Sequence, residues 1–254
     1  FKYHVDFGAL EIDADTAAIC ASRPTNPTGN VLTDEEVRRL SAMAAEAGIP
    51  LIIDGAYGLP FPNIVFNDAT PHWDENTILC LSLSKLGLPG ARTGIIVASE
   101  QIVEAIGGVN AICNLTTSGL GPALVQDLVE SGEIIRMSKD IIKPFYRRKV
   151  HDAVDQLRTE LSGYNLRIHQ PEGAIFLWLW FENLPVSSAE LYRRLKERGV
   201  LVLSGHYFFP GLESEWTHRH ECIRVNYSQD ASVVEQGLSI IADEVKRLYD
   251  GGSP

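Results

Sequence analysis

A lysine on a tight turn is the first sign of chemistry in this chain. In the stretch Ser82–Gly94, SLSKLGLPGARTG, Lys85 follows two serine hydroxyls and precedes the guanidinium of Arg92 by seven residues. Hydroxyl groups and a planar guanidinium bind phosphate oxygens, and glycines let backbone amides approach an anion closely. A lysine that is desolvated and close to another cation can act as a nucleophile. We therefore expect a reactive amine beside an anion site, with an ordinary solvated loop lysine as the alternative.

Two further polar segments follow apolar runs. Residues 22–30, SRPTNPTGN, form a loop that prolines and a glycine restrict and from which the amide of Asn26 projects. Residues 54–57, DGAY, place Asp54 and Tyr57 at the end of the next apolar run. Taken alone, the first is explained by an Asn-Pro turn and the second by a helix cap or an exposed loop carboxylate. Because open α/β sheets bind ligands at strand ends, both segments are also candidates for one site.

Arg224 lies inside an apolar stretch, CIRVNYS, that predicts a strand. Burying an unpaired guanidinium is costly, so this side chain needs a partner. The sequence leaves two partners open, a carboxylate elsewhere in the chain or the carboxylate of a ligand.

The elements that must position these residues alternate between strands and helices in the first half of the chain. Buried strands are predicted at residues 16–22, 49–54, 77–82 and 94–99. A helix is predicted over residues 33–48, because Thr33 and Glu36 form a capping box and Gly48 supplies a stop. This alternation favours an α/β fold with a mostly parallel sheet and helices on both faces.

The pattern changes after about residue 130. A long helical pattern runs from Ser131 towards Leu161, with Pro144 as a start or a kink. Strands are predicted after it at 165–169, 173–181, 200–203 and 222–227, and helices at 187–199 and 233–249. We therefore expect two domains, residues 1–130 in the α/β layer and residues 131–254 in a connecting helix with a smaller C-terminal α+β domain.

Composition limits the function classes. The 254 residues are 45% hydrophobic and carry a net charge of −11, which argues against a nucleic-acid partner. No apolar run approaches the roughly 18 residues that span a bilayer, and the start of the chain lacks the features of a signal peptide, so we expect no membrane partner. The four cysteines show no C-x-x-C pairing, which favours a reducing, cytoplasmic location.

Taken together and in this order, the motifs resemble those of the fold-type I aminotransferases, which use pyridoxal 5′-phosphate. The shared motifs are NPTG, D-x-A-Y, S-x-S-K followed by G-x-P-G-x-R-x-G, and R-x-N. The resemblance runs from about Phe1 to the end of the chain. It implies a partial fold-type I fold in which residues 1–130 are the C-terminal portion of the large cofactor-binding domain. Family members carry a long N-terminal region before this point, so we expect the chain to be cut from a longer parent.

The resemblance implies catalytic roles for three residues. Lys85 would form the covalent bond with the cofactor and shuttle a proton between the substrate Cα and the cofactor C4′. Asp54 would pair with the protonated pyridine nitrogen, and Tyr57 would hydrogen-bond the phenolic oxygen together with Asn26.

It also implies the residues that bind the two anionic ends. Ser82 and Arg92 would hold the cofactor phosphate, with Ser84 in a supporting role. Arg224 would bind the substrate α-carboxylate bidentately, with Asn26 beside it.

Longer matches resemble one branch of the family, whose members exchange an amino group between L-valine and pyruvate to give 3-methyl-2-oxobutanoate and L-alanine. These matches include SRPTNPTGNV, SLSKLGLPG, PEGAIFLWLWF and GHYFFPGL. Between Arg92 and Arg136 the chain has neither Arg nor Lys, whereas dicarboxylate-specific relatives place a second substrate-binding arginine roughly there. We therefore expect small apolar amino acids and 2-oxo acids as substrates, and a homodimer, as in the family. Ser204 stands where the family usually has proline, which predicts a looser loop near the substrate entrance.

Two other chemistries fit parts of the sequence. Ser82 and Lys85 also match the S-x-x-K motif of serine β-lactamases, but that motif opens a helix and needs a K-T-G strand, which the chain lacks. The segment HRHEC, with His218, His220 and Cys222, suggests a metal site that His206 would join, but no paired cysteines support it, and we predict no metal.

The alternative outside catalysis is a sensor. Some bacterial transcription regulators join a DNA-binding domain to an aminotransferase-like effector domain, and this chain resembles such a domain as well. The sequence that precedes it in the parent separates the two hypotheses, because a basic helix-turn-helix indicates a regulator and a Gly-rich loop indicates an enzyme.

Overall fold

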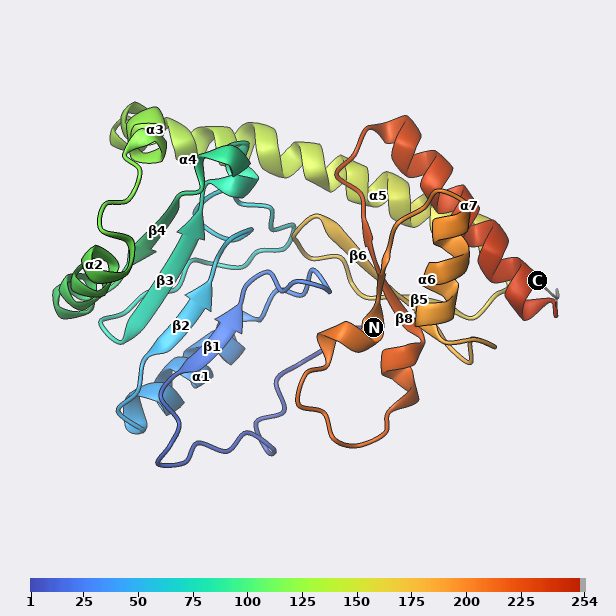
Figure 1. Cartoon of the computed structure of the whole chain (residues 1–254), viewed down its shortest axis with the longest axis horizontal. Helices are drawn as coiled ribbons and strands as arrows, with labels where there is room; N and C mark the ends of the chain where they lie inside the picture. Colours follow the sequence, from blue (N-terminus) through green and yellow to red (C-terminus); the bar gives the residue numbers. More distant parts are fainter. Residues whose placement is uncertain (252–254) are drawn as a thin grey trace.

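The chain folds into two four-stranded sheets that one long helix spans (Figure 1). The computed structural model describes residues 1–251. The first sheet contains β1 (Ile19–Ser22), β2 (Leu51–Asp54), β3 (Thr77–Ser82) and β4 (Gly94–Val97). The second contains β5 (Leu166–Ile168), β6 (Phe176–Phe181), β7 (Leu203–Ser204) and β8 (Cys222–Asn226). The helices are α1 (Asp34–Glu46), α2 (Glu100–Asn114), α3 (Leu120–Glu130), α4 (Glu133–Met137), α5 (Lys143–Glu160), α6 (Ser188–Glu197) and α7 (Ala231–Tyr249).

The first sheet has the expected, mostly parallel topology. β1, β2 and β3 run parallel in that order, and β4 lies antiparallel to β3. Parallel neighbours need a crossover connection, and α1 lies in the one between β1 and β2. The predicted capping box starts this helix: the Glu36 N–H donates to Thr33 Oγ1 (3.1 Å), and the Thr33 N–H donates to the Glu36 carboxylate (2.8 Å).

One face of this sheet is buried under helices. Leu51 of β2 and Leu79 of β3 belong to a core that includes side chains of α1, α3 and α4. Alternate residues point to the other face, where Cys20 is exposed and Ile52 is half-buried. Helix α2 has no buried residue, so its apolar side chains add nothing to this core.

The predicted pattern from Ser131 to Leu161 is a nearly continuous helix. Helix α4 passes into α5 through a π-helical turn at residues 138–142. Pro144 lies in the first turn of α5, where its missing N–H and its ring are accommodated by this wider turn. In Figure 1 the helix runs from the first sheet to the second.

The second sheet is antiparallel, in the order β5-β6-β8-β7. Alternation along β6 and β8 directs Leu177, Leu179 and Ile223 into a core that α5, α6 and α7 complete. Trp178 and Arg224 lie opposite each other in the register and therefore share the other face. This second face carries Arg224, the one candidate residue that the second sheet supplies.

Loop segments also join the two sheets. Val65 and Gly173 form an isolated antiparallel bridge. Next to it, Tyr57 and Ile64 pack with residues 174–176 in a small core of their own. The residues that follow β2 are thereby attached to the residues that precede β6.

Most predicted elements are present, with slightly different bounds. The strand expected over residues 200–203 is wrong in extent, because only Leu203 pairs with β8 there and β7 ends at Ser204. The sequence patterns do not predict α2 and α3, since Gly107 and Gly108 interrupt the apolar spacing of α2. The division into domains at residue 130 stays a prediction. Among residues 1–251, no helix combines the length and apolarity that crossing a bilayer requires.

Candidate active site

The candidate residues gather at one edge of the first sheet. Ser22 lies opposite Asp54 in the register, so the parallel strands β1 and β2 end together. Ser82 ends β3 and lies opposite Gly94, the first residue of the antiparallel β4. Loops that carry Asn26, Tyr57, Lys85 and Arg92 therefore leave or enter the sheet at its carboxyl edge, as the sequence predicts.

The loop after β1 holds Asn26 in contact with the second sheet. The Gly29 N–H donates to the Thr25 carbonyl (2.8 Å) and closes the turn. Gly29 has φ +69°, and a Cβ there would lie 2.5 Å from the Gly173 carbonyl oxygen, so only glycine fits. Asn26 Oδ1 accepts a hydrogen bond from Arg224 at 2.5 Å. The asparagine therefore does more than shape an Asn-Pro turn.

Asp54 and Tyr57 are three residues apart but differ in environment. The exposed Asp54 carboxylate accepts hydrogen bonds from the Ala56 N–H (3.0 Å) and from Ser22 Oγ (3.4 Å), as a loop carboxylate does. Tyr57 is buried, and its ring packs edge-on against Phe176 with 5.6 Å between ring centroids. Burial raises the pKa of the Tyr57 phenol, which keeps it protonated and able to donate.

Lys85 projects from two short 3₁₀ turns, residues 84–86 and 89–91. Gly87 lies between them at φ +110°, a conformation that disfavours any other residue. Lys85 Nζ lies 5.3 Å from the centroid of the Tyr57 ring, so the amine faces the phenol of the neighbouring loop. Within residues 1–251 this amine makes no hydrogen bond or ion pair, and the half-buried lysine is not simply solvated.

The three residues predicted to bind phosphate are only partly brought together. Ser82 Oγ accepts a hydrogen bond from the Ser84 N–H at 3.2 Å, which joins the two serines. Arg92 is exposed, has φ +47°, and donates to the carbonyl of Pro89 at 3.3 Å. Among the described residues its guanidinium is hydrogen-bonded to neither serine.

Arg224 lies on the second sheet and reaches across to the first. Its guanidinium carbon is 4.2 Å from the centroid of the Phe176 ring and 5.4 Å from that of Phe208. Desolvation lowers the pKa of Arg224, and the nearby Tyr57 opposes this effect. No carboxylate within residues 1–251 forms an ion pair with it, so the first of the two partners left open by the sequence is not found. Its partner in the chain is the Asn26 amide.

Sequence analysis missed the aromatic rings around this guanidinium. Phe176 and Phe208 occur in the segments PEGAIFLWLWF and GHYFFPGL, but nothing in the spacing indicates that both flank Arg224. The one available signal is the alternation along β6. Phe176 and Trp178 alternate with the core residues Leu177 and Leu179, so they lie on the opposite face of the strand.

The two competing chemistries are not supported by the geometry. Ser82 is the last residue of β3 rather than the first of an α-helix, which the S-x-x-K nucleophile requires. Residues 217–220 form a 3₁₀ turn, so the histidines of HRHEC do not line one side of a strand. His218 contacts Cys222 Sγ at 3.5 Å, but no group of three or more His, Cys, Asp or Glu side chains in residues 1–251 is placed to hold a metal.

The looser loop expected at Ser204 stays a prediction. The Ser204 hydroxyl is buried and hydrogen-bonded to Ser188 Oγ and to His206 Nδ1, both at 2.7 Å.

Comparison with known proteins places this geometry in a family. Residues 2–241 match the family described as Aminotransferase class I and II. The valine–pyruvate aminotransferase of Escherichia coli (strain K12) is 51% identical over 249 residues, which cover 98% of this chain and 60% of that protein. The crystal structure of valine–pyruvate aminotransferase from Salmonella typhimurium LT2 is similar with a TM-score of 0.94 and 50% identity, covering 99% of this chain and 65% of that one.

A more distant relative belongs to another functional class. An uncharacterized HTH-type transcriptional regulator of Bacillus subtilis (strain 168) is 26% identical over 232 residues, 88% of this chain and 45% of that protein. The chain thus spans well under two thirds of the length of both curated relatives.

Proposed function

Because the chain belongs to the class I and II aminotransferase family, we propose that the full-length protein exchanges an amino group between L-valine and pyruvate, giving 3-methyl-2-oxobutanoate and L-alanine. The observation that carries this proposal is the 51% identity to the Escherichia coli enzyme, which extends over 98% of the chain. The regulator is half as similar, at 26% identity, so the effector-domain alternative is not favoured.

The residues at the sheet edge suit pyridoxal 5′-phosphate, the cofactor we propose. The Lys85 amine, which has no hydrogen-bond or ion-pair partner within residues 1–251, faces the ring of the buried Tyr57, and the Asp54 carboxylate ends the adjacent strand. The Ser82 and Ser84 hydroxyls and the Arg92 guanidinium would be the donors for the phosphate, and Ser82 Oγ already accepts from the Ser84 backbone N–H. When bound, this cofactor supplies a ring that stabilises negative charge on the substrate Cα.

Four residues of the chain would have separate roles toward this cofactor. Lys85 would hold the cofactor covalently and, once released by the substrate, would move the proton between the substrate Cα and the cofactor C4′. Asp54 would pair with the protonated ring nitrogen, and Tyr57 would hydrogen-bond the phenolic oxygen. Asn26 would add a hydrogen bond there through its amide N–H, since its Oδ1 accepts from Arg224.

Arg224 binds the α-carboxylate that valine, alanine, pyruvate and other 2-oxo acids share. A guanidinium binds a carboxylate through two parallel hydrogen bonds, and one of its nitrogens is oriented by Asn26. The rings of Phe176 and Phe208 flank this guanidinium. Small apolar amino acids are the proposed substrates because the chain has neither Arg nor Lys between Arg92 and Arg136 to bind a second carboxylate.

Assembly and location complete the proposal. We propose a homodimer, supported by apolar side chains of α2 and α3 that are more than half exposed: Val109, Ile112, Leu120 and Leu124. A cytoplasmic location is proposed from the four cysteines, all of which are free thiols.

The direct test combines absorption spectroscopy with an assay of the purified full-length protein. We expect a visible absorption band on addition of pyridoxal 5′-phosphate, borohydride trapping on Lys85, and formation of L-alanine from L-valine and pyruvate. Faster turnover of L-aspartate than of L-valine would refute the substrate proposal. Trapping on another lysine would refute the assignment of Lys85.

A further inference from the structure

Residues 172–176 contact Arg224 and the loop that carries Asn26. At one end of this stretch, Glu172 and Gly173 contact the loop that carries Asn26. At the other end, the Phe176 ring lies under the Arg224 guanidinium at 4.2 Å. A five-residue stretch therefore connects two side chains that are 198 positions apart in the sequence.

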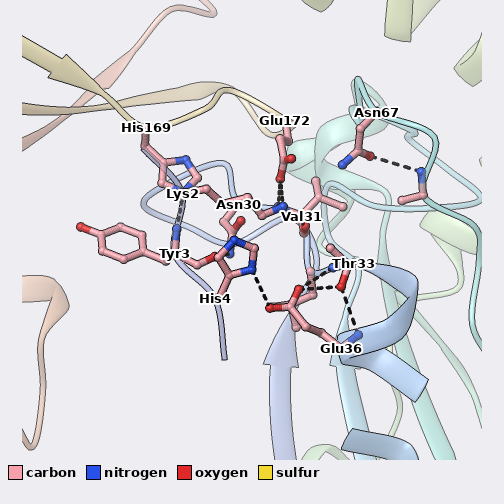
Figure 2. Close-up of polar contacts among 12 residues, drawn as sticks. Lys2, Tyr3, His4, Asn30, Val31, Thr33, Glu36, Asn67, His169 and Glu172 are labelled. Atoms are coloured by element: carbon pink, nitrogen blue, oxygen red, sulfur yellow. Dashed lines mark hydrogen bonds and ion pairs between the residues drawn. The ribbon is translucent and has the colours of Figure 1, made fainter. Parts of the chain in front are cut away.

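The Glu172 end is a buried polar contact among three chain segments. The Glu172 carboxylate is buried and accepts hydrogen bonds from the Val31 N–H (3.1 Å) and from Lys2 Nζ (2.5 Å). Lys2 Nζ also donates to the Val31 carbonyl (2.9 Å), so lysine and glutamate hold both backbone groups of one residue. Figure 2 shows Lys2, from the N-terminal segment, and Glu172, from the segment before β6, next to Val31.

Gly173 adds a steric contact to the same loop. A Cβ on Gly173 would lie 2.5 Å from the Pro24 Cγ atom, and a Cβ on Gly29 would lie 2.5 Å from the Gly173 carbonyl oxygen. Pro24, Gly29 and Val31 all belong to the loop that surrounds Asn26. The loop is thus held at three points, with Asn26 exposed between them.

We propose that Glu172, neutralised by Lys2, is a positioning residue for the substrate-carboxylate site. It holds the Asn26 loop in the position in which Asn26 hydrogen-bonds Arg224. The Phe176 ring packs against the same guanidinium. The proposal rests on the proposed function only in naming the substrate carboxylate as the ligand of Arg224. A buried carboxylate is costly unless it is paired and hydrogen-bonded. Lys2 supplies the pairing charge and the Val31 N–H supplies the hydrogen bond, so moving the loop would leave the Glu172 carboxylate without these partners.

The experiment is to replace Glu172 by glutamine in the full-length protein loaded with pyridoxal 5′-phosphate. Glu172→Gln keeps an acceptor for Val31 and leaves the Lys2 ammonium unpaired. We expect KM to rise about tenfold for both L-valine and pyruvate, because both present the same carboxylate, with kcat changed less than about twofold. In the protein without cofactor, amide hydrogen exchange of residues 25–31 should accelerate.

A second variant distinguishes loss of the Lys2–Glu172 charge pair from a nonspecific loss of stability. Lys2→Met/Glu172→Gln removes both charges. It should therefore bring KM back towards the wild-type value and restore most of the protection from hydrogen exchange. Glu244→Gln is the matched control, because Glu244 is equally buried and paired with Arg198 (3.0 Å) but lies on α7. It should lower stability without raising KM.

The outcomes decide between the claims. Unchanged KM and unchanged exchange in Glu172→Gln would overturn the proposal, as would an equal rise of KM in Glu244→Gln. If the wild-type protein transaminates neither substrate, the proposed function fails, and the exchange of residues 25–31 still decides whether Glu172 holds the loop.

Discussion

The candidate site has two halves that are built in different ways. The carboxylate half, Asn26, Tyr57, Phe176 and Arg224, comes from both sheets, and its side chains contact one another. The turn half, Ser82, Ser84, Lys85 and Arg92, comes from one segment of the first sheet, and its polar side chains contact mainly their own backbone.

This difference indicates which part of the site is ordered before a ligand binds. Contacts between distant segments immobilise Asn26 and Arg224 when the chain folds, so binding a carboxylate does not require them to be ordered again. Within residues 1–251, neither Lys85 nor Arg92 forms a hydrogen bond or ion pair with a distant segment, and Lys85 only faces the Tyr57 ring at 5.3 Å. We infer that the turn half becomes ordered when a phosphate binds.

Replacing Lys85 by alanine should remove nearly all activity. The amine that faces the Tyr57 ring is lost, so turnover of L-valine should fall by about 10⁴-fold or more. The measurement is L-alanine formation in the full-length protein. Lys196→Ala, an exposed lysine on α6, is the control and should retain full activity. Full activity in Lys85→Ala would refute the mechanism.

Replacing Arg224 by lysine should weaken substrate binding more than catalysis. Lysine keeps the charge but loses the planar pair of donors and the stacking on Phe176, so KM should rise about 100-fold for L-valine and for pyruvate. Steady-state kinetics with each substrate measure the effect. A fall in kcat with unchanged KM would show that Arg224 does not bind the carboxylate.

Gly29→Ala should destabilise the carboxylate half more than a matched change elsewhere. Gly29 and Gly48 both have φ +69°, so alanine at either position costs about 1 kcal/mol in backbone strain. At Gly29 the new Cβ also overlaps the Gly173 carbonyl, which adds roughly 2 kcal/mol, whereas nothing lies within 4 Å at Gly48. Urea denaturation of both variants checks the difference, and equal losses would contradict the packing described here.

Mild acid should lower the stability of the protein through His169. Burial lowers the pKa of His169 from 6.5 to about 4, and the ring stacks on Tyr3 beside the Lys2–Glu172 pair. Between these pH values the unfolded chain binds a proton that the folded chain does not. The free energy of unfolding should therefore fall as the pH drops from 6.5, by up to about 1.4 kcal/mol per pH unit from this group.

The check is urea denaturation at pH 7 and pH 5. His169→Gln removes the titrating ring, so its stability should depend less on pH than that of the wild type. His151→Gln, at an exposed position on α5, is the control and should keep the wild-type dependence. An unchanged slope in His169→Gln would assign the acid sensitivity to other groups.

Arg92→Ala should produce the smallest effect, confined to cofactor binding. Arg92 is exposed and bonded only to its own turn, so its loss should change the stability of the cofactor-free protein by less than about 0.5 kcal/mol. Its loss from the phosphate site should raise the dissociation constant of pyridoxal 5′-phosphate about tenfold. A large loss of stability without cofactor would mean that the turn half is ordered in advance as well.

Local signals located the turn half, because they depend on neighbours in the sequence. The alternation of β1–β4 with α1 and the capping box of Thr33 and Glu36 could be predicted, since each is a short-range pattern. Glycine and proline punctuation marked the turn of Lys85 for the same reason. These patterns placed the candidate residues at strand ends, and the parallel register then brought the strand ends together.

Long-range signals failed where side chains meet across sheets. The partner of Arg224 was left open, and the rings of Phe176 and Phe208 were not recognised as its neighbours. The pairing of Lys2 with Glu172, 170 positions apart, has no local pattern at all. The hydroxyl contacts of Ser204 were not predicted, because Ser188 and His206 meet it only after α6 and β7 have packed.

The sequence by itself therefore determined the strand order along the chain, the capped helix, the turn that carries Lys85 and the family. It could do so because backbone conformation and motif spacing are set over a few residues. Only the tertiary structure decided how Asn26 meets Arg224, which rings flank the guanidinium, and how Lys2 and Glu172 hold the loop. Those contacts depend on how β6 and β8 pair and on how residues 172–176 cross between the sheets, and burial of distant segments against one another sets both.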